Sequence, residues 1–299
     1  MDLHSKKILI FGIDSFTGKH MEKFFLKHDY FVYGTVLQKI SNDVNVYQCD
    51  VLNKENIKRV IELIKPSYII NLTGISFVGN KNRELFYRVN LIGVENILES
   101  ILQVNNYYPK KVILVSSATV YGNQKEIVLN EELCPNPINH YGLSKFAMEQ
   151  IAKNYFDKLN IIITRPFNYT GVGQSNEFVI PKIVSHYKNK KQFIELGNID
   201  VYREFNDVEY ICEVYKNLLE SNVSSEIINI ASSRLLTLKD VLLSMDKIAG
   251  YSIKVKINNK FVRKNEIKSL SGSIDKLFHY IRKVQQKDFV DTLKEMYND

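Results

Sequence analysis

The chain is poor in cysteine, proline and glycine, and it has no long apolar run. Its three cysteines, Cys49, Cys134 and Cys212, are far apart in the sequence and show no metal-ligand spacing. We therefore expect neither a disulfide framework nor a metal site, and a reducing compartment fits. No segment approaches the roughly 18 consecutive apolar residues of a membrane span, and the first residues lead into only a short apolar run. We predict a cytoplasmic protein with no membrane contact.

What the chain does contain is typical of a globular protein. Of its 299 residues, 45% are hydrophobic and 24% are charged, which allows one large core or a core with a smaller lobe. The net charge of +7 could serve a nucleic acid, but the lysines are scattered rather than gathered with aromatic residues on one element. An anionic small substrate or a plain solvated surface explains the excess equally well. We expect no nucleic-acid partner.

Short apolar runs alternate with segments of helical length. The runs span residues 7–11, 31–36, 68–72, 112–115 and 161–164, and the helical candidates span residues 18–25, 54–64, 83–102 and 141–156. Because parallel strands need crossover connections, this pattern predicts an α/β fold, a Rossmann-like doubly wound parallel sheet covered on both faces. After about residue 170 the pattern loosens, so we expect residues 1–168 to form one domain and residues 169–299 a smaller C-terminal lobe, interleaved with the last strands of the sheet.

The first strand ends in a turn that is typical of nucleotide binding. It reads Gly12-Ile13-Asp14-Ser15-Phe16-Thr17-Gly18. Such a turn needs glycine where the backbone approaches a pyrophosphate, and then a helix whose N-terminal N–H groups face the anion. Gly12 and Gly18 hold the outer positions, and Ser15 holds the middle one, where its hydroxyl could bond a phosphate oxygen. A tight turn without a ligand is the alternative.

Two further positions concern the cofactor. The second strand ends at Gly34-Thr35-Val36, without the acidic residue that would bond an adenine ribose or the arginine that would favour a 2′-phosphate. Lys39 is the nearest cation, so the sequence leans to NADP and leaves NAD open. Asp50-Val51 follows a short apolar run, where the carboxylate would bond an adenine amino group or, equally well, cap a helix.

The candidate catalytic residues are Tyr141 and Lys145, which are four residues apart and can share a helix face. An ammonium beside a phenol favours the phenolate, so we expect Lys145 to lower the pKa of Tyr141 from its usual value near 10. The segment Ser116-Ser117-Ala118-Thr119-Val120-Tyr121-Gly122 precedes them. Ser117 is the preferred hydroxyl for holding a carbonyl oxygen against Tyr141, and Ser116 and Thr119 are the alternatives.

Taken in order, these segments resemble the extended short-chain dehydrogenase/reductase family, in its branch that acts on nucleotide sugars. The motifs that carry the resemblance are the first turn, Asp50-Val51, Asn71-Leu72-Thr73-Gly74, Ser117 to Gly122, Tyr141 with Lys145, and Arg165-Pro166-Phe167-Asn168. They cover the chain from about residue 7 to about residue 278. The segments 165–174 and 197–208 look most like the GDP-6-deoxy-4-ketohexose (GDP-4-keto-6-deoxymannose) reductases and the related GDP-mannose 4,6-dehydratases.

The resemblance implies an NAD(P)-binding Rossmann domain in residues 1–168 and a nucleotide-sugar lobe in residues 169–299. It implies catalytic roles for Ser117, Tyr141 and Lys145. Cofactor contacts are implied for Gly12, Ser15, Phe16, Thr17, Gly18, Thr35, Asp50, Val51, Leu72, Thr73, Gly74, Tyr141, Lys145 and Pro166. Substrate contacts are implied for Thr119, Asn168, Val179, Arg203 and Arg263, with the two arginines binding the diphosphate.

The reaction that the resemblance implies is reduction of the C4 ketone of a nucleotide-linked 4-keto-6-deoxy sugar, GDP-linked by preference, with NADPH or alternatively NADH. The similar dehydratases carry an acidic residue after the catalytic hydroxyl, whereas Ala118 and Thr119 follow Ser117 here. The similar epimerase-reductases use a Cys and a His, where this chain has Ala118 and Tyr169. A C4 epimerase with tightly bound NAD uses the same catalytic residues and stays open, but Arg203-Glu204-Phe205 favours the reductase.

Several further expectations complete the interpretation. A non-catalytic NAD(P)-binding regulator is a remote alternative, since a fold does not fix a function. The resemblance implies a homodimer that pairs through residues 83–102 and 141–156. Low proline and glycine with abundant lysine, asparagine and isoleucine indicates an AT-rich bacterial genome, and hence synthesis of surface polysaccharide precursors. The nucleotide base and the configuration of the product stay open.

Overall fold

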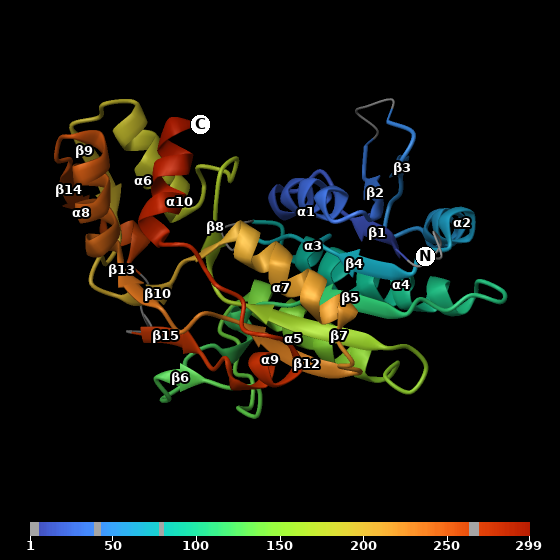
Figure 1. Ribbon diagram of the computed structural model, residues 1–299. Coiled ribbons are helices and arrows are strands. Elements are labelled where there is room, and N and C mark those ends of the chain that lie inside the picture. The colour runs from blue at the N-terminus through green and yellow to red at the C-terminus, as the bar shows by residue number, and fades with distance from the viewer. Residues whose placement is uncertain (1–5, 39–42, 78–80, 263–268) are drawn as a thin grey trace.

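The computed structural model describes residues 6–38, 43–77, 81–262 and 269–299. Within these residues, one parallel sheet has the strand order β12-β7-β5-β4-β1-β2-β3 (Figure 1). Its strands are β1 (Lys7–Phe11), β2 (Phe31–Val36), β3 (Val46–Gln48), β4 (Tyr68–Asn71), β5 (Lys111–Val115), β7 (Ile161–Pro166) and β12 (Glu226–Ile230). The order reverses between β1 and β4, and ligands of such sheets bind outside the carboxyl ends of the strands at this point.

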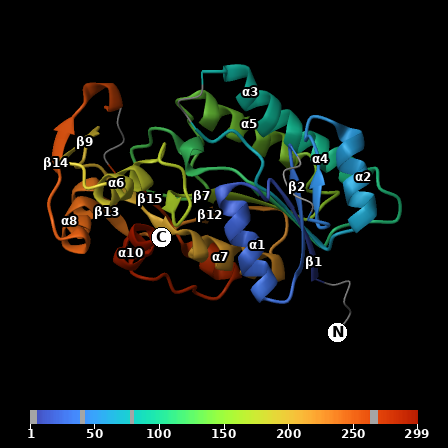
Figure 2. The ribbon, with the colours of Figure 1, turned by 90° about the horizontal axis from the view of Figure 1, so that it is seen from above.

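Helices cover both faces of the sheet (Figure 2). One face is covered by α1 (Phe16–Lys27), α7 (Val208–Glu220) and α9 (Asp275–Tyr280), and the other by α2 (Lys54–Ile64), α4 (Gly93–Leu102) and α5 (His140–Lys153). Successive strand residues point to opposite faces: Ile8 and Ile10 pack against the first group of helices, and Leu9 and Phe11 against the second. The predicted doubly wound α/β fold is therefore confirmed.

The predicted helix over residues 83–102 is the element that differs most from the expectation. It divides into α3 (Arg83–Tyr87), a π-helical turn η2 (Arg88–Ile92) and α4. The amide of Asn90 lies inside η2, accepts from Ile75 N at 2.8 Å and donates to Ser144 Oγ at 3.0 Å. These bonds to Ile75 and Ser144 stabilise the π-helical turn η2. The reason for the π-helical turn therefore lies in contacts outside residues 83–102.

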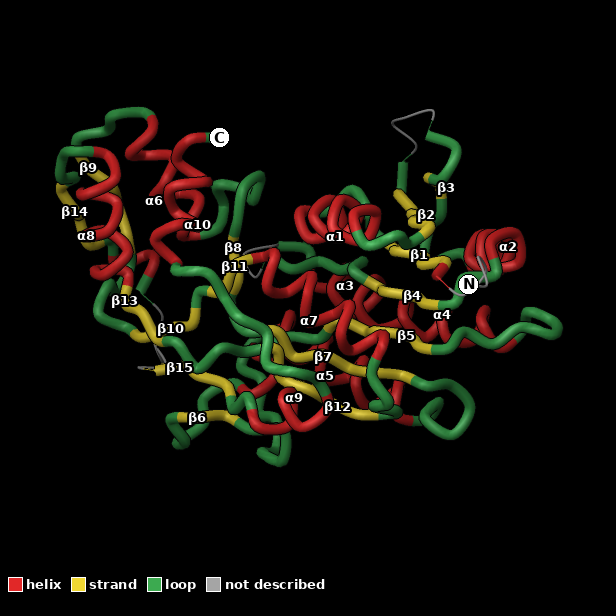
Figure 3. Tube along the Cα trace, viewed as in Figure 1, coloured by secondary structure: helices red, strands yellow, loops and turns green. Residues whose placement is uncertain are grey.

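The C-terminal half contributes a second, smaller core. It is built by α6 (Val179–Lys188), α8 (Leu238–Ala249), α10 (Phe289–Asn298) and the parallel pair β9 (Phe193–Leu196) and β14 (Lys254–Ile257). The remaining elements are short (Figure 3); they are η3 (Ala118–Tyr121), β6 (Val128–Leu129), β8 (Tyr169–Thr170), β10 (Tyr202–Glu204), β11 (Asn206–Asp207), β13 (Leu235–Thr237), η4 (Asn259–Phe261) and β15 (Ser269–Gly272).

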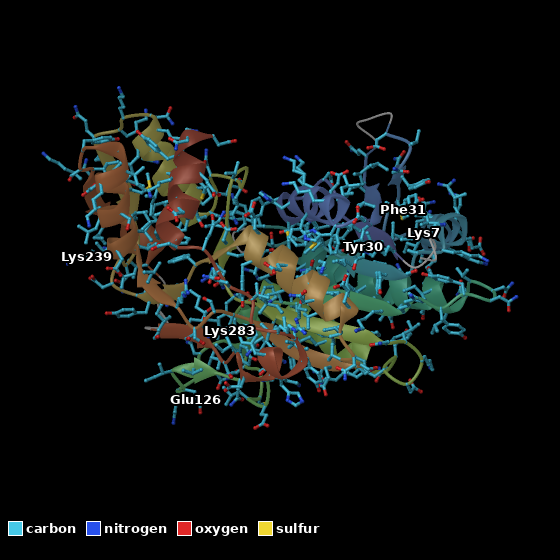
Figure 4. The ribbon with its side chains drawn as sticks, in the orientation of Figure 1. Lys7, Tyr30, Phe31, Glu126, Lys239 and Lys283 are labelled. Atoms are coloured by element: carbon cyan, nitrogen blue, oxygen red, sulfur yellow. The ribbon has the colours of Figure 1, made fainter. Side chains whose placement is uncertain are left out.

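The two halves of the sequence are interleaved, because β12, α7 and α9 come from the second half and complete the large sheet layer. The basic residues labelled in Figure 4 are far from one another: Lys7 lies on β1, Lys239 on α8 and Lys283 after α9. No helix of the described residues is both long enough and apolar enough to cross a membrane.

Candidate active site

The first turn of α5 positions Tyr141. Asn139 is extended and its side chain accepts from Gly142 N at 2.9 Å, which starts the helix. A Cβ at Gly142 would lie 2.8 Å from the carbonyl oxygen of Thr119. Glycine is therefore required for the close approach of α5 to η3, and this approach brings Tyr141 to Ser117.

The end of β5 and the first turns of α5 bring the three predicted catalytic residues together. The Ser117 hydroxyl is near enough to the Tyr141 phenol to act on its pKa in the lowering direction. The Lys145 ammonium donates to the carbonyl oxygen of Val115 at 2.7 Å. Thr119 Oγ1 donates to Ser117 Oγ at 2.9 Å, so Thr119 holds Ser117 in place. Ser116 faces elsewhere, because its hydroxyl is buried and donates to Glu149 at 2.6 Å.

The electrostatics of this cluster differ from the expectation. Burial raises the pKa of Tyr141 to about 12, while its hydrogen bond with Ser117 acts in the lowering direction and nearby Tyr169 adds to the rise. The prediction that Lys145 lowers the pKa of Tyr141 is therefore wrong for this structure. Burial also lowers the pKa of the Lys145 ammonium to about 8, opposed by the negative charge of Glu149.

The first βα turn has the backbone that a pyrophosphate needs. Gly12 has φ +80°, and a Cβ at Gly18 would lie 2.5 Å from the carbonyl oxygens of Gly12 and Ile13. Ser15 caps α1, its hydroxyl accepting from Gly18 N at 3.0 Å. The first N–H groups of α1, those of Phe16 and Thr17, have no carbonyl acceptor within the helix. The turn therefore fits an anionic dinucleotide.

The residues predicted to contact the adenosine, Thr35, Asp50 and Val51, differ in what their atoms bond. Thr35 is buried, and its carbonyl oxygen accepts from Gly12 N and Ile13 N, both at 3.1 Å, so it shapes the turn. Asp50 accepts from Leu52 N at 2.9 Å, whereas Asn53 is the N-cap of α2. The alternative that Asp50 caps this helix is therefore wrong. Val51 is buried, and Lys39 lies outside the described residues.

The end of β4 brings a second set of cofactor candidates to the Lys145 ammonium. Leu72 N donates to the carbonyl oxygen of Phe11 at 3.0 Å, and Thr73 bonds the side chain of Asn71 through N and Oγ1. A Cβ at Gly74 would lie 3.0 Å from Asn90 Oδ1 and 3.3 Å from Lys145 Nζ. Sequence reasoning missed Asn90, although it lies in the middle of the predicted helix 83–102.

A hydrogen bond joins the first turn of α1 to β8. Thr17 Oγ1 and Tyr169 Oη are 2.8 Å apart, and the rings of Phe16 and Tyr169 stack with centroids 6.2 Å apart. Tyr169 also acts electrostatically on Tyr141. Tyr169 thus connects the first βα turn with Tyr141.

The remaining predicted residues lie on the strands and loops of the second half or beside them. Pro166 is buried at the end of β7, and Asn168 is exposed with its carbonyl oxygen accepting from Asn206 N at 2.9 Å. Val179 begins α6 and packs on the smaller core, and the half-buried Arg203 donates to the carbonyl oxygen of Tyr202 at 2.7 Å. Arg263 lies outside the described residues. No group of acidic, histidine or cysteine side chains in the described ranges could hold a metal ion.

The fold is that of the extended short-chain dehydrogenases/reductases, as the sequence motifs predicted. The chain belongs to the family described as GDP-mannose 4,6 dehydratase, whose model matches residues 9–296.

Known proteins resemble the chain over nearly its full length. GDP-6-deoxy-D-talose 4-dehydrogenase of Aggregatibacter actinomycetemcomitans is 33% identical over 295 residues, which cover 98% of this chain and 97% of the relative. A crystal structure of a candidate epimerase from Burkholderia cenocepacia J2315 has a TM-score of 0.92 and 37% identity, with coverage of 98% and 97%. The RMD protein of Pseudomonas aeruginosa in complex with NADPH has a TM-score of 0.87 and 22% identity, with coverage of 98% and 97%.

Proposed function

We propose that the protein reduces the C4 ketone of a nucleotide-linked 4-keto-6-deoxy sugar, GDP-linked by preference, and uses NADPH. The observation that carries this proposal is the meeting of Ser117 and Tyr141 at the carboxyl end of β5, where Lys145 donates to the carbonyl oxygen of Val115. The 33% identical relative is named for action at C4 of a GDP-6-deoxy sugar, which supports the sugar class.

In this proposal each side chain of the cluster has one task. The reaction converts a C4 ketone, NADPH and a proton into a C4 alcohol and NADP⁺. The bound nicotinamide supplies the hydride. Ser117 donates a hydrogen bond to the ketone oxygen and holds it beside Tyr141, and Tyr141 gives its proton to the oxygen as the alcohol forms. Lys145 contributes positive charge at the end of β5, and the phenolate left on Tyr141 takes its next proton from solvent.

Tyr141 is protonated at neutral pH, since burial raises its pKa to about 12, and it can therefore give a proton to a ketone oxygen. A C4 epimerase uses the same tyrosine, first as base and then as acid. The preference for reduction therefore rests on the segment Arg203-Glu204-Phe205. Dehydration is disfavoured because Ala118 and Thr119, which follow Ser117, carry no carboxylate.

The cofactor assignment rests on the turn at residues 12–18 and on the end of β4. NADPH is preferred because the described residues after β2, Leu37 and Gln38, offer no carboxylate to a ribose hydroxyl, and the RMD protein was crystallised with NADPH. We assign the sugar nucleotide to the second half of the chain, where Asn168, Val179 and Arg203 lie; Thr119 and Arg263 complete the proposed set.

The test is to incubate the protein with 4-keto-6-deoxy sugars linked to GDP, dTDP, UDP or CDP and to follow NADPH and NADH absorbance separately. We expect NADPH oxidation with the GDP-linked ketone, and a C4 alcohol whose configuration is read from proton NMR coupling constants. No oxidation of either cofactor with any of these ketones would overturn the proposal.

A second candidate function, C4 epimerisation with tightly bound NAD, is supported by the candidate epimerase at 37% identity. It predicts interconversion of unmodified sugar nucleotides without net cofactor consumption, and NAD that copurifies with the protein. The non-catalytic regulator would bind the cofactor but would convert neither the 4-keto-6-deoxy sugars nor the unmodified sugar nucleotides.

The expected homodimer, cytoplasmic location and polysaccharide role stay predictions. Ile92 on η2 and Leu143 on α5, both on segments expected to pair, are 43% and 44% exposed. Light scattering on the eluting protein measures its mass, and a monomer at micromolar concentration would contradict the dimer.

A further inference from the structure

One face of α5 contacts three successive residues at the end of β5. Tyr141, Lys145 and Glu149 are spaced one helical turn apart and therefore share this face. Tyr141 lies by Ser117, which acts on its pKa, Lys145 donates to the carbonyl oxygen of Val115, and Glu149 accepts from Ser116. The two catalytic candidates are thus the first two members of a set of three.

The third member, Glu149, is fully buried and held from two sides. Ser116 Oγ donates to Glu149 Oε1 at 2.6 Å. Arg165 on β7 donates through Nε to Oε1 at 3.0 Å and through Nη2 to Oε2 at 2.7 Å. The Arg165 guanidinium lies 4.8 Å from the centre of the Tyr121 ring, and Arg165 and Glu149 are 2% and 0% exposed. Such bidentate pairing fixes both the position and the orientation of the carboxylate.

This arrangement has a consequence for Lys145, which is only 5% exposed. A buried ammonium loses its proton readily unless an opposite charge lies nearby. Tyr141 and Glu149 share the face of Lys145 on its own helix, and Arg165 on β7 pairs with Glu149. The neighbours from η2 and from the loop after β4, Asn90 and Gly74, carry no charge. The negative charge of Glu149 acts on the Lys145 ammonium and raises its pKa, against the effect of burial.

We propose that Glu149 is a positioning residue, which fixes α5 against the end of β5 and keeps the Lys145 ammonium charged during turnover. Its catalytic consequence rests on the proposed function, whereas its effect on Lys145 does not. Arg165 and Ser116 serve by holding the carboxylate.

The experiment measures the titration of Lys145 directly. The protein is labelled with ¹³C at lysine Cε, and the Lys145 signal is assigned by its loss in Lys145→Arg. We expect a pKa near 8 in the unchanged protein. In Glu149→Gln we expect it to fall by about one unit, the lower end of the effect of a close opposite charge. Ser116→Ala is the matched control, because it removes one hydrogen bond from the carboxylate and leaves the charge in place.

An unchanged Lys145 pKa in folded Glu149→Gln would overturn the proposal, and so would an equal fall in Ser116→Ala. Because Glu149→Gln leaves Arg165 buried without its partner, folding is checked by near-ultraviolet circular dichroism. Where that variant does not fold, Glu149→Leu with Arg165→Met removes both charges together. In the double variant we expect the pKa of Lys145 to fall by less than in Glu149→Gln. An unchanged Lys145 pKa in the double variant would count against the proposal.

Kinetics separate this inference from the proposed function. In the active enzyme, the upper pKa of kcat/KM should fall together with the Lys145 pKa in Glu149→Gln. If the protein of the original sequence reduces no ketone, while the Lys145 pKa falls in Glu149→Gln as expected, the proposed function alone is refuted. An active enzyme in which Glu149→Gln moves neither pKa refutes the inference alone.

Discussion

At the scale of single residues, the site depends on one hydroxyl pair. Ser117 is held by Thr119 and meets Tyr141 because Gly142 permits the close approach of α5. In the proposed reaction Tyr141 carries the proton, and its pKa of about 12 leaves it protonated across the physiological range. The phenol can therefore donate to an oxygen that is becoming an alkoxide.

We expect Tyr141→Phe to lower turnover with the preferred ketone by ~10²–10⁴, the usual contribution of a general acid. The ring stays, so the affinity for NADPH should be unchanged, as measured by quenching or enhancement of nucleotide fluorescence. Tyr108→Phe, at a residue that is 71% exposed, is the control and should turn over like the unchanged protein. Turnover in Tyr141→Phe within threefold of that value would remove the phenol from the mechanism.

At the scale of elements, the π-helical turn η2 links three parts of the site. Asn90 bonds both backbone groups of Ile75, at 2.8 and 3.2 Å, and donates to Ser144 Oγ at 3.0 Å. Ser144 in turn donates to the carbonyl oxygen of Tyr141 at 2.8 Å. The loop after β4, η2 and the first turn of α5 are thereby held in one arrangement.

Asn90→Ala should lower the free energy of unfolding by about 2 kcal/mol, because it leaves buried or half-buried partners without hydrogen bonds. Urea denaturation measures the loss as a lower midpoint with an unchanged slope. Glu84→Gln, on the exposed surface of α3, should change it by less than about 0.5 kcal/mol. Equal urea midpoints for Asn90→Ala and Glu84→Gln would show that the hydrogen bonds of Asn90 in η2 do not stabilise the protein.

The elements differ in how well the sequence predicts them. The strands of the large sheet are buried apolar runs, and β1, β2 and helix α2 have the predicted bounds. The turn η2 was missed, since its cause is a contact of Asn90 with residues 15 and 54 positions away. The pair of Glu149 and Arg165 was missed for the same reason, because it exists only once β7 lies beside β5. The short strands of the second half carry too few residues for a period to appear.

At the scale of the whole molecule, Glu204 joins the smaller half to the large sheet. This fully buried carboxylate on β10 accepts from Gly272 N and Ser232 N, each at 2.7 Å, and from Ser271 Oγ at 3.2 Å. Gly272 ends β15, and Ser232 follows β12 of the large sheet. One side chain therefore satisfies donors from both layers.

Glu204→Gln should destabilise the protein by about 3 kcal/mol, because an amide nitrogen then faces backbone donors that need an acceptor. The change is measured by urea denaturation, with Glu213→Gln on the exposed face of α7 as the control. Equal midpoints for the two variants would show that Glu204 does not join the halves.

The return of the chain to the sheet has a consequence for synthesis on the ribosome. Strand β7 ends at Pro166, and its outer neighbour β12 begins only at Glu226. At about 5–20 residues per second, the nascent chain spends several seconds with the outer edge of β7 unpaired. Open edges of this kind pair readily with other chains, so we expect slower translation between these two strands to increase aggregation of the newly made protein.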